Sequence, residues 1–280
     1  MKFINIAEEQ MTSATKALQR YRDFFNEYFL FEERKEFEEE IQNIIENTDF
    51  NITRSNIALL TEKLQSLADL IEKEEKVIIP DIVFLIGLGH IDAQGLIING
   101  KPYTYFNMTQ MNEVLTIKSF TLDIPLLHEM FHAIHYFYSP SFYIRSYRSV
   151  EHQYLKTMIA EGVAVYFSKE IKKANFEDAL WSGLIDNKHY KKWYKNCRTN
   201  KYAIWEFMKN TIENNKFDTS LDDILFSFLG TTPEEIVEGR LGYYYGLEIV
   251  EKAVKRVGKD KILSLDYDTF KNYAEEYFNE

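Results

Sequence analysis

Residues 126–137 read Leu-Leu-His-Glu-Met-Phe-His-Ala-Ile-His-Tyr-Phe, an otherwise apolar stretch that contains three histidines and one glutamate. His128 and His132 stand four residues apart, with Glu129 directly after the first histidine. In a helix of 3.6 residues per turn, positions four apart lie on one face about 6 Å from each other, so both rings can point at one metal ion. The pattern His-Glu-x-x-His in an apolar segment therefore predicts a zinc site with a carboxylate beside it.

The flanking residues predict where this helix begins and ends. Thr121 or Asp123 can cap its N-terminus, and Pro125 suits the first turn. The pair Ser139-Pro140 ends the helix. Glu129 lies about 100° round the helix from the first histidine, beside the ion and not on it. A carboxylate there can take a proton from a zinc-activated water and give it to a leaving amine, so we expect Glu129 to be general base and then general acid.

A catalytic zinc takes three protein ligands and keeps one position for water, so a third ligand is needed. His135 is seven residues, about 10.5 Å of helix rise, from His128, and we expect it to be a neighbour of the site. Glu161 is the better candidate, because it is the only charge in the apolar run 158–167 of a second predicted helix. A buried carboxylate without a partner is costly, whereas one that binds a cation is satisfied. The small residues around Gly162 would let this helix approach the first one closely.

The combination of these two segments resembles a known family. His-Glu-x-x-His followed on a second helix by Glu-Gly-x-Ala (161–164) is similar to the gluzincin metallopeptidases. In that family the second-helix Glu is the third zinc ligand, which implies that His128, His132 and Glu161 hold one Zn²⁺ per chain. The run 161–167 more closely resembles predicted zinc-dependent proteases catalogued as a domain of unknown function. Those proteins tend to carry a Gly-Tyr-x-x-Gly stretch near the C-terminus, and this chain has one at 242–246.

The stretch 242–246 has a possible chemistry of its own. Peptide hydrolysis passes through a tetrahedral oxyanion, and zinc sites of this kind need a second electrophile opposite the metal. Three successive tyrosines lie between Gly242 and Gly246, and the resemblance points to Tyr243 as the oxyanion donor. Arg240 is then a possible partner for a substrate carboxylate or carbonyl. The alternative, that these aromatic residues only pack under a helix start, stays open.

Composition argues against other classes of partner. Forty-four acidic against thirty-three basic residues give a net charge of −11, which argues against nucleic acid. No signal peptide and no run of about eighteen apolar residues is seen, so no membrane partner is expected. The lone Cys197 fits a reducing compartment, and we expect a cytoplasmic location. The expected partner is a peptide or protein substrate, and the sequence predicts no particular oligomeric state.

The sequence predicts two regions. Residues 1–75 form an N-terminal helical region, with helices over 7–30, 31–46 and 55–76. Residues 76–280 form a zincin-like metallopeptidase domain of the α+β class, with a small mixed β-sheet, the His-Glu-x-x-His helix and C-terminal helices. A helix start is predicted at Thr231–Glu235, and His90 is expected to be a loop residue.

The sheet of this domain is predicted from three runs rich in strand formers, 77–80, 82–87 and 95–106. Asn99-Gly100 between such runs is typical of a hairpin turn. In the proteases that the chain resembles, an edge strand before the active-site helix pairs with the extended substrate. We expect the stretch around Gly95 to be that edge and to bind substrate.

These observations predict a zinc-dependent peptidase in which metal-activated water attacks a peptide carbonyl. Two alternatives stay open. One is a non-catalytic or regulatory protein with a structural zinc held by four protein ligands, for which His135 or His152 could supply the fourth. The other is a metal-free helical scaffold on which the histidine pair has no function.

Overall fold

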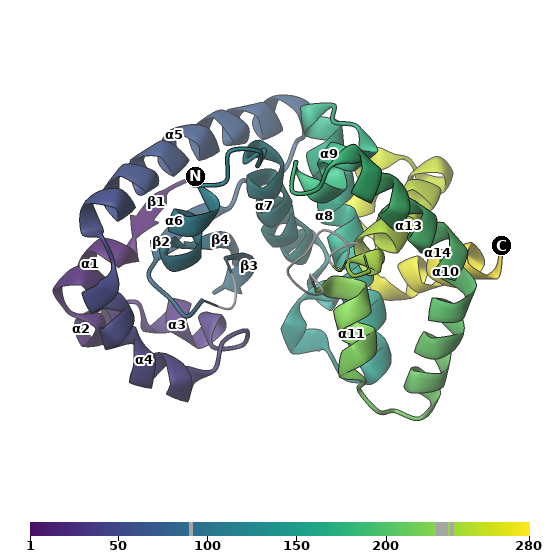
Figure 1. Cartoon of the computed structure of the whole chain (residues 1–280), viewed down its shortest axis with the longest axis horizontal. Coiled ribbons are helices and arrows are strands. Elements are labelled where there is room, and N and C mark those ends of the chain that lie inside the picture. Colours follow the sequence, from purple (N-terminus) through teal and green to yellow (C-terminus); the bar gives the residue numbers. More distant parts are fainter. Residues whose placement is uncertain (90–91, 228–234, 236–237) are drawn as a thin grey trace. The chain divides into compact units, whose positions relative to one another are not determined.

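The computed structural model describes residues 1–89, 92–227, 235 and 238–280. It is a mixed α+β fold, mostly helical, with a small four-stranded sheet (Figure 1). The contacts divide the chain into two compact units, residues 1–137 and 138–280. The predicted separation of residues 1–75 as a region of their own stays a prediction. His90 and residues 231–234 of the predicted helix start lie outside the described residues.

The first unit combines the sheet with the N-terminal helices. Its described elements are β1 (Phe3–Asn5), α1 (Ile6–Thr12), α2 (Ala14–Arg20), α3 (Arg22–Tyr28), α4 (Arg34–Asn47), α5 (Phe50–Glu74), β2 (Asp81–Leu85), β3 (Ala93–Ile98), β4 (Lys101–Asn107), α6 (Met108–Val114) and α7 (Asp123–Tyr138). The strand order is β1-β2-β4-β3, with β1, β2 and β4 parallel and β3 antiparallel to β4. The predicted small mixed sheet is therefore confirmed, and β3 is an edge strand, as expected for the stretch around Gly95.

The β3–β4 hairpin turns where the sequence predicts it. Asn99 and Gly100 have φ values of 50° and 74°, so both central residues adopt the left-handed region that a tight two-residue hairpin requires. Gly100 is suited to this conformation because it has no Cβ. The turn pairs Ile98 with Lys101 and sets the register in which Gly95 faces Thr104 across the strands.

Different helices pack against the two faces of the sheet. On one face Gly95 and Thr104 contact α7, as described below. On the other face Tyr105 packs against Phe24 and Tyr28 of α3, with ring centroids 6.1 and 5.3 Å apart. Successive side chains of a strand point to opposite faces, which explains how neighbours on β4 serve two helices. The sheet thus lies between α3 and α7.

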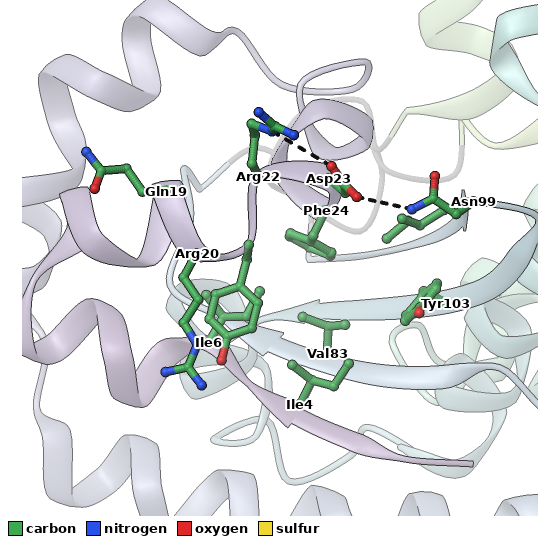
Figure 2. Close-up of a pocket in the computed structure, with 12 residues that line it drawn as sticks. Ile4, Ile6, Gln19, Arg20, Arg22, Asp23, Phe24, Val83, Asn99 and Tyr103 are labelled. Carbon is green, nitrogen blue, oxygen red and sulfur yellow. Dashed lines mark hydrogen bonds and ion pairs between the residues drawn. The ribbon is translucent and has the colours of Figure 1, made fainter.

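A pocket of about 440 Å³ lies on the α3 face of the sheet (Figure 2). Ile4, Val83 and Tyr103 form its apolar floor. At its rim the Asn99 amide donates a hydrogen bond to Asp23 at 3.1 Å. Since Tyr103 and Thr104 are neighbours on β4 with opposite directions, this pocket is on the side of the sheet away from α7.

The N-terminal helices differ from the sequence prediction in their limits. The single helix predicted over 7–30 is wrong, because three short helices, α1 to α3, occupy this region. Ser13 is extended, with φ −166°, and its side chain caps α2 by accepting from the Lys16 N–H. The helix predicted over 55–76 is α5, which begins at Phe50, five residues earlier than predicted, because Asp49 caps it. The strand predicted at 77–80 is absent, and β2 starts directly after Pro80.

The second unit consists of helices in its described part, as the sequence predicts. Its elements are the 3₁₀ turns η1 (Pro140–Phe142) and η2 (Ile144–Ser146), the π-helix η3 (His152–Lys156), α8 (Thr157–Lys172), α9 (Phe176–Trp181), α10 (Asn187–Glu213), α11 (Thr219–Phe226), α13 (Leu241–Val257), the 3₁₀ helix η4 (Lys259–Ser264) and α14 (Tyr267–Asn279). The core of this unit is the contact between α8 and α13 (Figure 1). Within the described residues, no helix is both long and apolar enough to cross a membrane.

Glycines permit the close approach of α8 and α13. A Cβ built on Gly162 would lie 2.1 Å from the carbonyl carbon of Gly246, and one on Gly246 would overlap the Met158 carbonyl oxygen. Any side chain at either position would push the two helices apart. The sequence predicts that Gly162 lets its helix approach the histidine helix. The close approach observed at Gly162 is to α13.

Candidate metal centre

The histidine motif lies on α7, which is fixed at its N-terminal end by charge. Asp123 is in the first turn, where the negative charge of a carboxylate interacts favourably with the helix dipole. The Lys63 ammonium on α5 donates a hydrogen bond to this carboxylate at 3.1 Å. The predicted helix over the motif is confirmed, and it continues to Tyr138, just before Ser139-Pro140.

Gly95 determines how closely α7 lies against the sheet. A Cβ built on this glycine would be 2.5 Å from the backbone nitrogen of Ala133 and 2.9 Å from the carbonyl carbon of His132. Since any side chain would collide with the helix backbone, only glycine permits this contact between β3 and α7. Next to it, the Thr104 hydroxyl on β4 donates to the Glu129 carbonyl at 3.4 Å. The structure thus gives Gly95 a packing role, while its predicted role in substrate binding stays a prediction.

His128 and His132 face one point, as the sequence predicts. Their Nε2 atoms are 3.0 Å apart, and the rings are nearly perpendicular, at 84°. Two imidazole nitrogens on a tetrahedral zinc, each at about 2.05 Å, would be about 3.3 Å apart. The pair therefore fits a zinc ion after a change of a few tenths of an ångström. Without a metal, the same separation suits a hydrogen bond from one neutral ring to the other.

The surroundings of the pair are those of a partly enclosed site. The His132 residue is 2% exposed, and the side chains of His128 and Glu129 are 12% and 19% exposed. Donor atoms of these three residues all lie within 4.8 Å of one another, so together they could hold a metal ion. Glu129 Oε1 is 3.9 Å from His128 Nε2, which brings the carboxylate beside the point that the two rings face.

His135 is completely buried one turn after His132. The pKa of His135 is lowered to about 3, mainly by burial and to a smaller extent by the neighbouring His132. Its ring is therefore neutral at ordinary pH, and it stacks on Tyr136 with centroids 6.2 Å apart. Since His135 does not belong to the three-residue donor group, it is a neighbour of the site, as the sequence predicts.

Glu161 lies half-buried on α8 in the second unit. Its predicted role as third ligand stays a prediction. Thr157 is one helical turn before Glu161, and its hydroxyl is 3.3 Å from the Tyr147 hydroxyl. Burial is the largest cause that raises the pKa of Tyr147 to about 12; the hydrogen bond with Thr157 opposes this, and the charge of Glu161 adds to it. Tyr147 and Thr157 could not be predicted from the sequence as neighbours of this region, because nothing in the local pattern connects them with Glu161.

The three tyrosines of α13 have different surroundings. Tyr245 is buried and donates its hydroxyl hydrogen to the Cys197 carbonyl at 2.9 Å, and Tyr244 is 4% exposed. Tyr243 is only half-buried. The Arg240 guanidinium lies over the Tyr243 ring at 4.1 Å and near the Trp181 ring at 5.4 Å. Tyr243 is thus the one of the three with partial access to solvent, and its predicted role as oxyanion donor stays a prediction.

His152, the other candidate for a fourth ligand, lies in the π-helix η3. Its Nδ1 accepts a hydrogen bond from the Arg148 N–H at 3.2 Å, and its ring packs edge-on against Tyr267. Burial is the main cause that lowers the pKa of His152. One of its two nitrogens is therefore already in use by the backbone.

Comparisons of the chain with known protein families, with curated proteins and with solved structures find no match. The functional interpretation of the site therefore rests on the geometry of the histidine pair and on the resemblance of the sequence motifs to those of known metallopeptidases.

Proposed function

We propose that the chain is a zinc-dependent peptidase of the gluzincin type, with a zincin-like domain. The observation that carries this proposal is the pair of imidazole nitrogens 3.0 Å apart on a largely buried helix, with a carboxylate alongside. An apolar helix has no structural need for this combination, whereas a catalytic metal requires it. The sequence resemblance supplies Glu161 as the third ligand and zinc as the metal.

Glu129 has the central chemical role in this proposal. Zinc held by His128, His132 and Glu161 would polarise the substrate carbonyl and make water acidic enough to attack it near neutral pH. The Glu129 carboxylate takes the proton that the attacking water loses. It then gives this proton to the leaving amine, so one group acts as base and afterwards as acid.

Other residues bind the peptide and its transition state. The half-buried Tyr243 hydroxyl donates a hydrogen bond to the oxyanion that forms on the substrate carbonyl. The two aromatic rings around Arg240 hold its guanidinium, which presents N–H donors to a substrate carboxylate or carbonyl. β3 is an edge strand beside α7, so an extended peptide can add to it by backbone hydrogen bonds.

The experiment is Glu129→Gln, which removes the proton acceptor and keeps the size of the side chain. We expect one zinc per chain to remain and hydrolysis of a fluorescent peptide library to fall by about 10²-fold or more. Glu113→Gln, at an exposed position of α6 in the same unit, is the matched control and keeps full activity. Retained hydrolysis by Glu129→Gln, or a wild-type protein without zinc, would refute the proposal.

Hydroxamate binding distinguishes this proposal from a structural zinc site. A hydroxamate needs an open coordination position, which a zinc with four protein ligands does not have. His135 is fully buried outside the donor group, which favours an open site. We expect the zinc-loaded protein to bind acetohydroxamate and the zinc-free protein to lose this binding.

A further inference from the structure

Lys156 is a buried lysine in an unusual place. It ends the π-helix η3, is 3% exposed, and directly precedes α8. Its ammonium donates hydrogen bonds to the hydroxyl and the carbonyl of Ser146, at 2.9 and 3.2 Å. Among the described residues, no carboxylate forms a salt bridge with it. Buried charges are normally paired, so this lysine is held at a cost that another benefit must offset.

Two tyrosine rings complete the surroundings of this ammonium. The Nζ atom lies 5.5 Å from the Tyr147 ring centroid and 5.2 Å from that of Tyr267. Both contacts are within the range of cation–π attraction. Because Lys156 also holds Ser146, the residue before Tyr147, it fixes the backbone and the ring of this tyrosine together.

The hydroxyl of Tyr147 consequently has a defined position next to α8. It is 3.3 Å from the Thr157 hydroxyl, at the first residue of that helix. Residues four apart on a helix share one face, so Thr157 and Glu161 are neighbours on the side of α8 that Tyr147 covers. Since Glu161 lies on this face, the phenol hydroxyl beside Thr157 can donate a hydrogen bond towards its carboxylate.

We propose that Tyr147 is a positioning residue that donates its hydroxyl hydrogen to the Glu161 carboxylate, and that Lys156 holds Tyr147 in place for this purpose. Either hydroxyl can be the donor in the contact between Tyr147 and Thr157; in the proposed arrangement Thr157 donates to Tyr147, which leaves the hydrogen of Tyr147 for Glu161. Carboxylate ligands of metals are oriented by outer partners of this kind. The inference rests on the proposed function, in which Glu161 is the third zinc ligand.

The test is zinc affinity, measured on the full chain by competition with a chelating dye. Tyr147→Phe removes only the hydroxyl, and we expect zinc binding to weaken about 10- to 100-fold. Tyr267→Phe is the matched control, because its ring also lies over Lys156 but its hydroxyl donates to Glu151 at 3.1 Å. We expect its zinc affinity to stay within about twofold of wild type.

A spectroscopic readout and a rescue distinguish positioning from a general loss of folding. The cobalt-substituted protein is expected to show altered visible bands in Tyr147→Phe and wild-type bands in Tyr267→Phe. Thr157→Ser keeps the hydroxyl and is expected to keep zinc affinity, whereas Thr157→Val loses it in part. The urea denaturation midpoint of metal-free Tyr147→Phe is expected to match that of Tyr267→Phe.

The outcomes separate this inference from the proposed function. If Tyr147→Phe binds zinc as tightly as wild type, with the same cobalt spectrum, the inference is overturned and the peptidase proposal stands. If Glu161→Gln leaves zinc affinity unchanged, or the wild type binds no stoichiometric zinc, the proposed function itself fails and the inference with it.

Discussion

Replacing Gly95 by alanine tests the link between the sheet and the histidine helix. The added Cβ would lie 2.5 Å from the backbone nitrogen of Ala133, whereas ordinary contact begins at 3.4 Å. The helix α7 or the strand β3 must therefore move by about 0.9 Å, and neither can do so by rotating a side chain. Overpacking of this kind costs about 1–3 kcal/mol, of which the lower entropy of the unfolded alanine chain offsets up to about 1 kcal/mol. We expect a net loss of about 1–2 kcal/mol.

The same displacement acts on the metal site, because the added Cβ also meets the carbonyl carbon of His132 at 2.9 Å. Metal sites tolerate misplacements of only about 0.5 Å, so we expect zinc affinity to fall about tenfold or more in Gly95→Ala. Urea unfolding of the metal-free protein and dye competition for zinc are the two assays.

Gly100→Ala is the control on the same hairpin. Its Cβ would meet nothing within 4 Å, but its φ of 74° strains any side chain, at a cost of about 1–2 kcal/mol. Both variants should thus lose similar stability, and only Gly95→Ala should lose zinc affinity. Equal zinc affinity in the two variants would show that the contact of β3 with α7 does not position His132.

Two further predictions concern the oxyanion donor and a buried histidine. Tyr243→Phe is expected to lower kcat about 10²-fold, with zinc content unchanged and KM within about threefold. The control is Tyr202→Phe, at an exposed position, which should have no effect on kcat. Equal kcat in both variants would contradict the role of Tyr243. The pKa of His135 is lowered to about 3 in the folded chain, so its stabilising contribution is complete above the unfolded pKa of about 6.5 and is lost as the pH falls towards 3. Between pH 7 and pH 5 the metal-free wild type should lose about 2 kcal/mol more than His135→Phe in urea unfolding, and parallel pH dependences would refute this.

The sequence predicts those parts of the fold that local chemistry determines. The limits of α7 follow from Pro125 near its start and the Ser139-Pro140 pair after its end, and the β3–β4 hairpin follows from Asn99-Gly100. β1 could not be predicted in this way. It consists of three residues, Phe3–Asn5, that become a strand only by pairing with β2, which begins at Asp81.

In the candidate site, too, only the local features can be predicted from the sequence. Two imidazoles four residues apart on one helix are a local feature, and their convergence is confirmed at 3.0 Å. The surroundings of Lys156 arise from tertiary packing, because Ser146 belongs to a separate 3₁₀ turn and Tyr267 is distant from it in sequence. The role of Gly95 likewise depends on a helix backbone almost forty residues later, which a strand pattern cannot reveal.

X-ray absorption at the zinc edge of the purified, zinc-reconstituted protein tests the proposed metal centre. We expect one zinc per chain with two imidazole nitrogens and additional oxygen donors at about 2.0–2.2 Å. We also expect His128→Ala and His132→Ala each to abolish stoichiometric zinc binding. A wild-type protein without stoichiometric zinc, or a zinc whose surroundings contain no imidazole, would contradict the proposed metal centre.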